Sequence, residues 1–157
     1  MPMNEEVLER LFRALAAEKV RYALFGGLAV AAQGLARATK DVDLFLDDEP
    51  ENVRAAVRAL QSVFADPDLD EITPEMLANY GLVRYGVRDH DFVVDLTQRI
   101  GEKFSFRDLE VAEIDYLGTK VQVVTPRTLV RMKRDTGRPQ DQLDVARLRE
   151  RFDLEDV

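Results

Sequence analysis

Two aspartates separated by one residue, Asp41 and Asp43, are the side chains of this sequence best placed to do chemistry. Side chains alternate between the faces of a β-strand, so both carboxylates share one face while Val42 and Leu44 point to the other. Residues i and i+2 lie roughly 6–7 Å apart. The repulsion of two ionised carboxylates at that distance costs on the order of 2–3 kcal/mol at an effective dielectric of about 20. Solvent, a basic neighbour or a raised pKa would relieve it, but a divalent cation does so most directly.

A pair of glycines precedes the aspartates. Gly26 and Gly27 stand between an apolar run, Tyr22 to Phe25, and a helix-compatible segment, residues 28–33, which Gly34 closes. The pattern predicts a strand, a tight turn and a helix start, where a phosphate can approach the backbone and meet free N–H groups. Each half alone is more typical of an ordinary tight turn or of a solvent-facing strand. Together they indicate a polyphosphate and its cation in one cleft.

A third carboxylate interrupts a later apolar segment. Asp95 lies within the strand-like run Phe92 to Leu96 and shares a face with Val93 and Thr97. An unpaired charge buried there would be expensive. Asp95 is therefore either a third acid directed at the site or an aspartate on an edge strand that faces water. His90, in the preceding turn, is expected to be a surface residue.

The elements that position these residues alternate between helical and strand periodicity. Capping residues and apolar spacing predict helices after Asn4, from Pro50, after Thr73-Pro74 and after Thr125-Pro126. Antiparallel hairpins are expected at 82–96 and 111–124. The segment from Ala65 to Glu71 is expected to be a surface loop with solvated acids. The fold class is therefore α/β (α+β), a mixed sheet with helices packed against it.

Composition limits the class of protein. With 157 residues, 46% hydrophobic and 33% charged, the chain is expected to form a single domain over 1–157. It has no cysteine, which excludes disulfides and thiolate chemistry. No signal peptide is recognisable, and the longest apolar run, Leu24 to Ala32, is too short to span a bilayer. We expect a cytoplasmic protein that does not enter a membrane.

The glycine pair, the thirteen residues that follow it and the Asp41-Val42-Asp43 strand resemble the signature of the nucleotidyltransferase superfamily related to DNA polymerase beta. Arg37 and Thr39 complete an R-x-T-x-D-x-D form. This form is similar to a small bacterial branch containing the AbiEii-type abortive-infection toxins and, more distantly, the antibiotic nucleotidyltransferases. Many members of the superfamily have Gly-Ser where this chain has Gly26-Gly27, so a serine contact to phosphate is missing.

A second resemblance lies near the C-terminus. Lys133, Asp141 and Asp144 look like the C-terminal motif of the AbiEii-type branch, in which a lysine and two acids on successive helices face the cleft. Gln140 departs from the Lys-Asp pair common there. Read from the residues alone, Asp141 and Asp144 are i and i+3 in the first turns of a helix, where the dipole favours acids in any case. Both interpretations stay open.

The resemblance implies a minimal nucleotidyltransferase fold that transfers a nucleoside monophosphate from a nucleoside triphosphate to an acceptor hydroxyl. It implies two Mg²⁺ ions held by Asp41, Asp43 and Asp95, the last of which completes the second metal site or takes the acceptor proton. The implied nucleotide-binding residues are Gly26, Gly27, Arg37, Thr39, Lys133, Asp141 and Asp144.

The acceptor is the least determined part of the prediction. A tRNA 3′ end, a small molecule and a protein are all compatible with the resemblance, as is a toxin with a cognate antitoxin. The net charge is −8, yet Pro126 to Phe152 carries eight Lys or Arg against four Asp or Glu. These helices could guide one RNA end if their basic residues share a face, whereas a long duplex would need a broader basic surface. Three alternatives remain: a nucleotide-binding or antitoxin-associated module without turnover, an antibiotic nucleotidyltransferase, and a structural protein with solvated acids.

Overall fold

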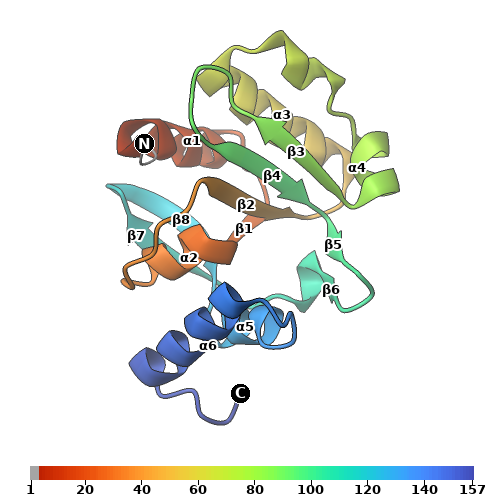
Figure 1. The fold of residues 1–157 in the computed structure, drawn as a ribbon. Helices are drawn as coiled ribbons and strands as arrows, with labels where there is room; N and C mark the ends of the chain where they lie inside the picture. The colour runs from red at the N-terminus through yellow and green to blue at the C-terminus, as the bar shows by residue number, and fades with distance from the viewer. Residues whose placement is uncertain (1–3) are drawn as a thin grey trace.

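A mixed six-stranded sheet forms the centre of the fold (Figure 1). The computed structural model describes residues 4–157. The strand order is β3-β4-β2-β1-β8-β7, in which β1 pairs in parallel with β8 and β2 in parallel with β4, while the other neighbours are antiparallel. The strands are β1 (Tyr22–Phe25), β2 (Asp41–Leu46), β3 (Leu82–Gly86), β4 (Val93–Thr97), β7 (Val111–Tyr116) and β8 (Thr119–Val124).

Helices cover both faces of this sheet. The two longest early helices, α1 (Glu5–Ala17) and α3 (Pro50–Phe64), pack together on one face (Figure 1). The short helix α2 (Gly26–Ala32) lies on the other face, where it contacts α5 (Pro126–Lys133); α5 in turn packs against α6 (Pro139–Phe152). The predicted fold class, a mixed sheet with helices packed against it, is confirmed.

Helix starts follow the predicted capping residues. The Asn4 side chain accepts hydrogen bonds from the backbone N–H groups of Glu6 and Val7, and Pro50 occupies the first turn of α3. Thr73 caps α4 (Pro74–Tyr80), and Thr125 caps α5 in the same way. Each cap satisfies backbone donors that have no partner within the helix, which fixes where the chain turns from strand to helix.

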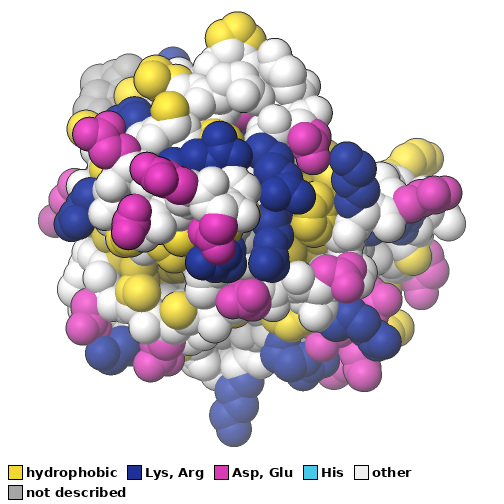
Figure 2. All heavy atoms as spheres, turned by 90° about the horizontal axis from the view of Figure 1, so that it is seen from below, with side chains coloured by type: hydrophobic (Ala, Val, Ile, Leu, Met, Phe, Trp, Pro, Cys, Tyr) yellow, Lys and Arg dark blue, Asp and Glu magenta, His cyan; other side chains and the backbone are white. Residues whose placement is uncertain are grey.

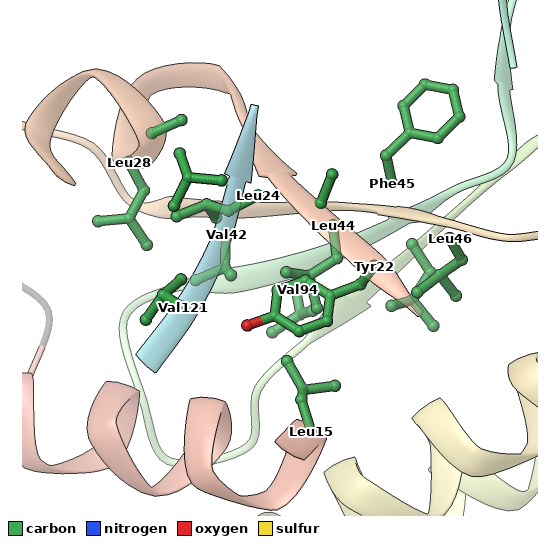
Figure 3. Close-up of a cluster of buried hydrophobic side chains, with 14 of the residues drawn as sticks. Leu15, Tyr22, Leu24, Leu28, Val42, Leu44, Phe45, Leu46, Val94 and Val121 are labelled. Atoms are coloured by element: carbon green, nitrogen blue, oxygen red, sulfur yellow. The ribbon is translucent and has the colours of Figure 1, made fainter. Parts of the chain in front are cut away.

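A large part of the core lies between the sheet and α1 and α3 (Figure 3). Leu11, Phe12 and Leu15 of α1 are fully buried, as the 3.6-residue period of that helix predicts. Val42 and Leu44 of β2 are also fully buried and alternate with the partly exposed Asp41 and Asp43. The apolar face of β2 therefore anchors the strand in the core and leaves its acidic face directed away from it.

The segment between α3 and α4 differs from the prediction of a solvated loop. Residues Pro67–Glu71 form a 3-10 helix, in which Leu69 is fully buried. Asp66 is only 3% exposed and accepts a hydrogen bond from the Tyr85 hydroxyl at 2.9 Å. The expectation that its acids are solvated is wrong for Asp66, because the neighbouring hairpin supplies a hydrogen-bond donor that the sequence pattern does not show.

Three further short elements lie between β4 and β7. The strands β5 (Arg99–Ile100) and β6 (Phe104–Ser105) pair in a small antiparallel sheet that was not predicted, and a 3-10 turn, Phe106–Asp108, follows it. Within residues 4–157, none of the helices combines the length and apolar character needed to cross a membrane.

Candidate active site

One cavity collects most of the predicted site residues. It has a volume of about 450 Å³ and is bounded by the acidic face of β2 and β4, by the start of α2 and by α5. The predicted residues on its wall are Gly26, Gly27, Arg37, Thr39, Asp41, Asp43, Asp95, Lys133 and Asp141. Asp144 does not line the cavity. It is fully buried behind the wall.

Strand register brings the three aspartates together. Asp43 pairs with Asp95 across the parallel strands β2 and β4, and it pairs with Phe25 of β1 on its other side. Neighbouring strands lie about 4.7–4.9 Å apart, so Asp41, Asp43 and Asp95 crowd one patch of the sheet. Because Gly26 directly follows Phe25, the start of α2 is held against the same patch.

Asp95 is only 2% exposed and is paired with an arginine that the sequence analysis did not identify. Arg84 of β3 donates through Nε and Nη2 to the two carboxylate oxygens of Asp95, at 2.9 and 3.0 Å. The hydrogen bonds and charge of Asp95 raise the pKa of Arg84. Strand β4 lies between β2 and β3, so the interpretation of Asp95 as an edge-strand residue facing water is wrong.

The surroundings of Asp43 disfavour its ionised form. Burial, together with repulsion from Asp95 and Asp41, raises the pKa of Asp43 to about 7, and the nearby charge of Lys133 only partly opposes this. No basic side chain of residues 4–157 forms an ion pair with Asp41 or Asp43. The site therefore holds negative charge that its own basic residues do not neutralise.

These carboxylates form a donor set suited to a hard divalent cation, which prefers oxygen ligands. No group of three or more acidic or histidine side chains within residues 4–157 is already gathered around a metal position. Both oxygens of Asp95 accept hydrogen bonds from Arg84. Burial, together with repulsion from its acidic neighbours, raises the pKa of Asp43, and a cation held by Asp41 and Asp43 would relieve that cost.

Protein side chains pack closely against the two glycines. Helix α2 begins at Gly26 itself rather than at Leu28. Gly26 has φ +71°, and a Cβ there would overlap the Asp43 carboxylate. A Cβ at Gly27 would lie 3.2 Å from Arg37 Cζ and from Thr39 Cβ. The pair is thus required for close packing against Asp43, Arg37 and Thr39, a role that neither the predicted phosphate contact nor the alternative of an ordinary turn included.

A buried ionic network supports the opposite wall. Lys133 Nζ donates to Asp141 and to Asp144, at 3.1 Å in each case. Arg37 Nε donates to both oxygens of Asp144, at 3.1 and 3.3 Å. Buried charges are tolerated when they are paired and hydrogen-bonded in this way. The network joins α5, α6 and the segment before β2, and it leaves Arg37 and Lys133 at the cavity wall.

The two acids of this network differ in position. Burial acts to raise the pKa of Asp141, but the hydrogen bond from Thr136 and the charge of Lys133 hold it below its usual value. Asp144 also accepts from Gln140 at 3.2 Å, so the residue that departs from the family pattern joins the network. The predicted contact of Asp144 with a nucleotide does not fit its full burial, which instead makes it a support for Arg37 and Lys133.

The cavity also has residues that sequence reasoning missed. Arg84 and Thr97 flank Asp95, and Leu82, Arg99 and Ile100 continue the same wall. Two signals could have identified the first pair: Arg84 lies opposite Asp95 in the predicted hairpin, and Thr97 shares the face of Asp95 two residues along. Phe25, Leu129, Met132, Thr136 and Arg138 complete the lining and have no such signal.

The basic residues of the last helices do not form a free patch. Lys133 is buried between two acids, and Arg131, Arg134 and Arg138 each pair with an acid. Arg147 and Arg149 donate to the backbone carbonyls of Ala36 and Val157. On the face in Figure 2, Lys and Arg side chains are likewise interspersed with Asp and Glu. The predicted guide for an RNA end is therefore not provided by these helices.

Replacing Asp43 by asparagine tests the electrostatics. An acid whose pKa is raised on folding destabilises the folded state once it is ionised, so the penalty is absent below about pH 4 and complete above about pH 7. Asp43→Asn should therefore raise the melting temperature at pH 8 by a few degrees, corresponding to roughly 1–2 kcal/mol, and have little effect at pH 4. Thermal unfolding across this range, without divalent cations, measures the difference. The exposed Asp48→Asn is the matched control, and an equal effect of both variants would contradict the account.

The comparisons with known proteins concern the fold. No protein-family model matches the chain, and no curated protein sequence matches it. Among solved structures, it is similar to the lincosamide antibiotic adenylyltransferase LnuA with lincomycin bound. The two sequences are 14% identical, the match covers 95% of this chain and 98% of that chain, and the TM-score is 0.58. An antigenic nucleotidyltransferase-like protein from Paracoccidioides brasiliensis is 18% identical over 92% of this chain and 74% of its own, with a TM-score of 0.57.

A third similar structure is ANT(2″)-Ia in complex with adenylyl-2″-tobramycin. It is 15% identical over 92% of this chain and 86% of its own, with a TM-score of 0.52. At these identities the likeness concerns the backbone arrangement rather than individual site residues. The chain therefore has the fold of these nucleotidyltransferases.

Proposed function

We propose that this protein is a nucleotidyltransferase, which transfers a nucleoside monophosphate from a nucleoside triphosphate to an acceptor hydroxyl. The observation that carries the proposal is the convergence of Asp41, Asp43 and Asp95 on one wall of the cavity, directly beside the start of α2. The shared fold supports it, although a fold alone does not establish an activity. The chemistry of the site supplies the additional argument.

In this proposal Asp41 and Asp43 would hold Mg²⁺, and Asp95, whose two oxygens already accept from Arg84, serves as the base rather than as a metal ligand. A divalent cation bound there supplies charge neutralisation for the triphosphate and for the developing charge at the transferred phosphoryl group. Arg37 and Lys133 line the same cavity as the acids. Their buried supports hold them in place, so their remaining N–H donors are oriented for the outer phosphates without a conformational search.

The transfer itself is a substitution at the α-phosphorus. A bond forms between the acceptor oxygen and this phosphorus, the bond to the bridging oxygen of the β-phosphate breaks, and pyrophosphate leaves. Asp95 takes the acceptor proton. A carboxylate has about four lone-pair positions, and Arg84 engages one on each oxygen. Asp95 therefore keeps acceptor capacity while Arg84 fixes its orientation.

The finer assignment concerns the branch and the acceptor. The R-x-T-x-D-x-D form and the C-terminal lysine and acids favour the AbiEii-type branch, with a tRNA 3′ end as acceptor and a cognate antitoxin as partner. An antibiotic acceptor is the second candidate, because two proteins of similar fold are solved with lincomycin and with adenylyl-2″-tobramycin. A cytoplasmic location is compatible with either.

Label transfer tests the function. The protein is incubated with Mg²⁺, each α-labelled nucleoside triphosphate in turn, and total tRNA, an antibiotic panel or no added acceptor. We expect label on one acceptor with release of pyrophosphate, and loss of both in Asp41→Asn. Nucleotide binding without label on any acceptor would instead favour a binding module without turnover. Absence of Mg²⁺-dependent nucleotide binding would contradict the site altogether.

Replacing Gly26 by alanine tests the link between the glycine and the acids. A Cβ at Gly26 would displace the Asp43 carboxylate, so Gly26→Ala should weaken Mg²⁺-dependent triphosphate binding by at least about tenfold, or roughly 1.4 kcal/mol. Gly34→Ala is the matched control, because Gly34 also has a positive φ but nothing within 4 Å of its Cβ position. Calorimetric titration with a non-hydrolysable triphosphate measures both. Equal losses in the two variants would show that backbone strain, not the acid, is responsible.

A further inference from the structure

The pairing of Arg84 with Asp95 bears on how many cations the site can hold. Strand register places Arg84 of β3 opposite Asp95 of β4, and Asp95 opposite Asp43 of β2. Side chains at paired positions share one face of a sheet, so the arginine extends the row of acids. Its Nε and Nη2 atoms each donate to a different oxygen of Asp95, at 2.9 and 3.0 Å. This two-point geometry is the strongest way in which arginine binds a carboxylate.

The charge of Arg84 acts on the whole acidic cluster. The hydrogen bonds and charge of Asp95 raise the pKa of Arg84, and the charges of Asp41 and Asp43 add to the increase. A guanidinium does not lose its proton in a protein, so a permanent positive charge lies among these three acids. Asp95 uses two of the five N–H donors of Arg84, which lines the cavity and has a side chain that is 60% exposed. Further donors therefore remain for a ligand.

A second divalent cation would need Asp95 as a ligand. Both oxygens of Asp95 are already engaged by Arg84, and a cation bound there would lie beside a guanidinium of the same sign of charge. In the described part of the chain, no three acidic or histidine side chains are arranged to hold one metal ion. Asp41 and Asp43, by contrast, have no such arginine on their oxygens. Two carboxylates together with substrate phosphates are a usual ligand set for one Mg²⁺.

We infer that this site holds one divalent cation, and that the guanidinium of Arg84 takes the place of a second. The inference rests on the proposed function and specifies how that same site stabilises charge. Asp41 and Asp43 hold the cation together with the triphosphate. Arg84 orients Asp95 as the base and places its positive charge beside the acceptor oxygen from which Asp95 takes the proton. This differs from the two ions that the resemblance implies.

Counting the bound metal ions tests the inference without relying on activity. The protein is mixed with an equal concentration of a triphosphate whose α,β-bridging oxygen is replaced by a methylene group. Mn²⁺ is then titrated in, while electron paramagnetic resonance measures the free ion. We expect one Mn²⁺ to bind to each wild-type complex. Two Mn²⁺ ions bound to each wild-type complex would overturn the inference.

Arg84→Gln removes the charge but leaves an amide that can still donate to Asp95. Because Asp95 is then open to a cation, the number of bound Mn²⁺ ions should rise from one to two, whereas Arg84→Lys keeps the charge and should keep the number at one. Arg88→Gln is the matched control, because Arg88 is also 60% exposed and pairs with a buried acid, Asp66, but does not line the cavity. One Mn²⁺ in Arg84→Gln would overturn the role of Arg84. The wild-type count decides the number of ions even if this variant does not fold.

The Mg²⁺ dependence of label transfer gives a second readout. At low Mg²⁺ concentration, Arg84→Gln should lower the rate by about 10²-fold, a typical effect of removing one group that stabilises developing charge. A higher Mg²⁺ concentration should restore part of the rate, because a second ion then supplies the missing charge. Arg88→Gln should match the wild-type protein at every concentration. A loss in Arg84→Gln that Mg²⁺ does not reduce would contradict the exchange of a guanidinium for an ion.

Failure of the proposed function gives a different result. If the wild-type complex binds no Mn²⁺, or if the protein does not bind the triphosphate, the site itself is contradicted and the inference falls with it. Two Mn²⁺ ions that are both lost in Asp41→Asn would instead leave the proposed function in place and overturn only the inference. One Mn²⁺ that is lost in Asp41→Asn supports both.

Discussion

The repulsion among three carboxylates held on one patch of the sheet is the constraint on which the rest of the site depends. Asp41, Asp43 and Asp95 are brought together by strand register, which the apolar residues on the opposite faces of β2 and β4 enforce. A slip of one residue would turn Val42 and Leu44 out of the core. Folding therefore imposes the charge cluster, and burial together with this repulsion raises the pKa of Asp43.

Basic residues approach these carboxylates from two sides. Arg84 neutralises Asp95 from the neighbouring strand, while Arg37 and Lys133 face the cluster from the other wall. Those two residues are oriented by Asp144, which has no exposed surface and accepts hydrogen bonds from both. Removing one partner of such a buried pair leaves an uncompensated charge and is strongly destabilising. The support is thus both structural and electrostatic, and it leaves Asp41 and Asp43 available to a cation.

Much of the fold could be predicted from the sequence because its local signals agree with one another. Asn4, Thr73 and Thr125 cap helices as expected, and the alternation in β2 separates acids from core residues. The contacts within the site could be predicted less well. Which residues meet across the cavity depends on packing between distant elements, as in the contact of Arg37 with Asp144. The burial of Asp66 was missed for the same reason, since its partner Tyr85 lies on another element.

The most direct test of the account is a crystal structure with Mn²⁺ and a triphosphate whose α,β-bridging oxygen is replaced by a methylene group. Anomalous scattering locates the metal independently of the protein model. The account predicts manganese bound to the carboxylates of Asp41 and Asp43, with the triphosphate between the start of α2 and Lys133. Manganese or nucleotide bound elsewhere, with Asp41 and Asp43 making no contact to either, would contradict it.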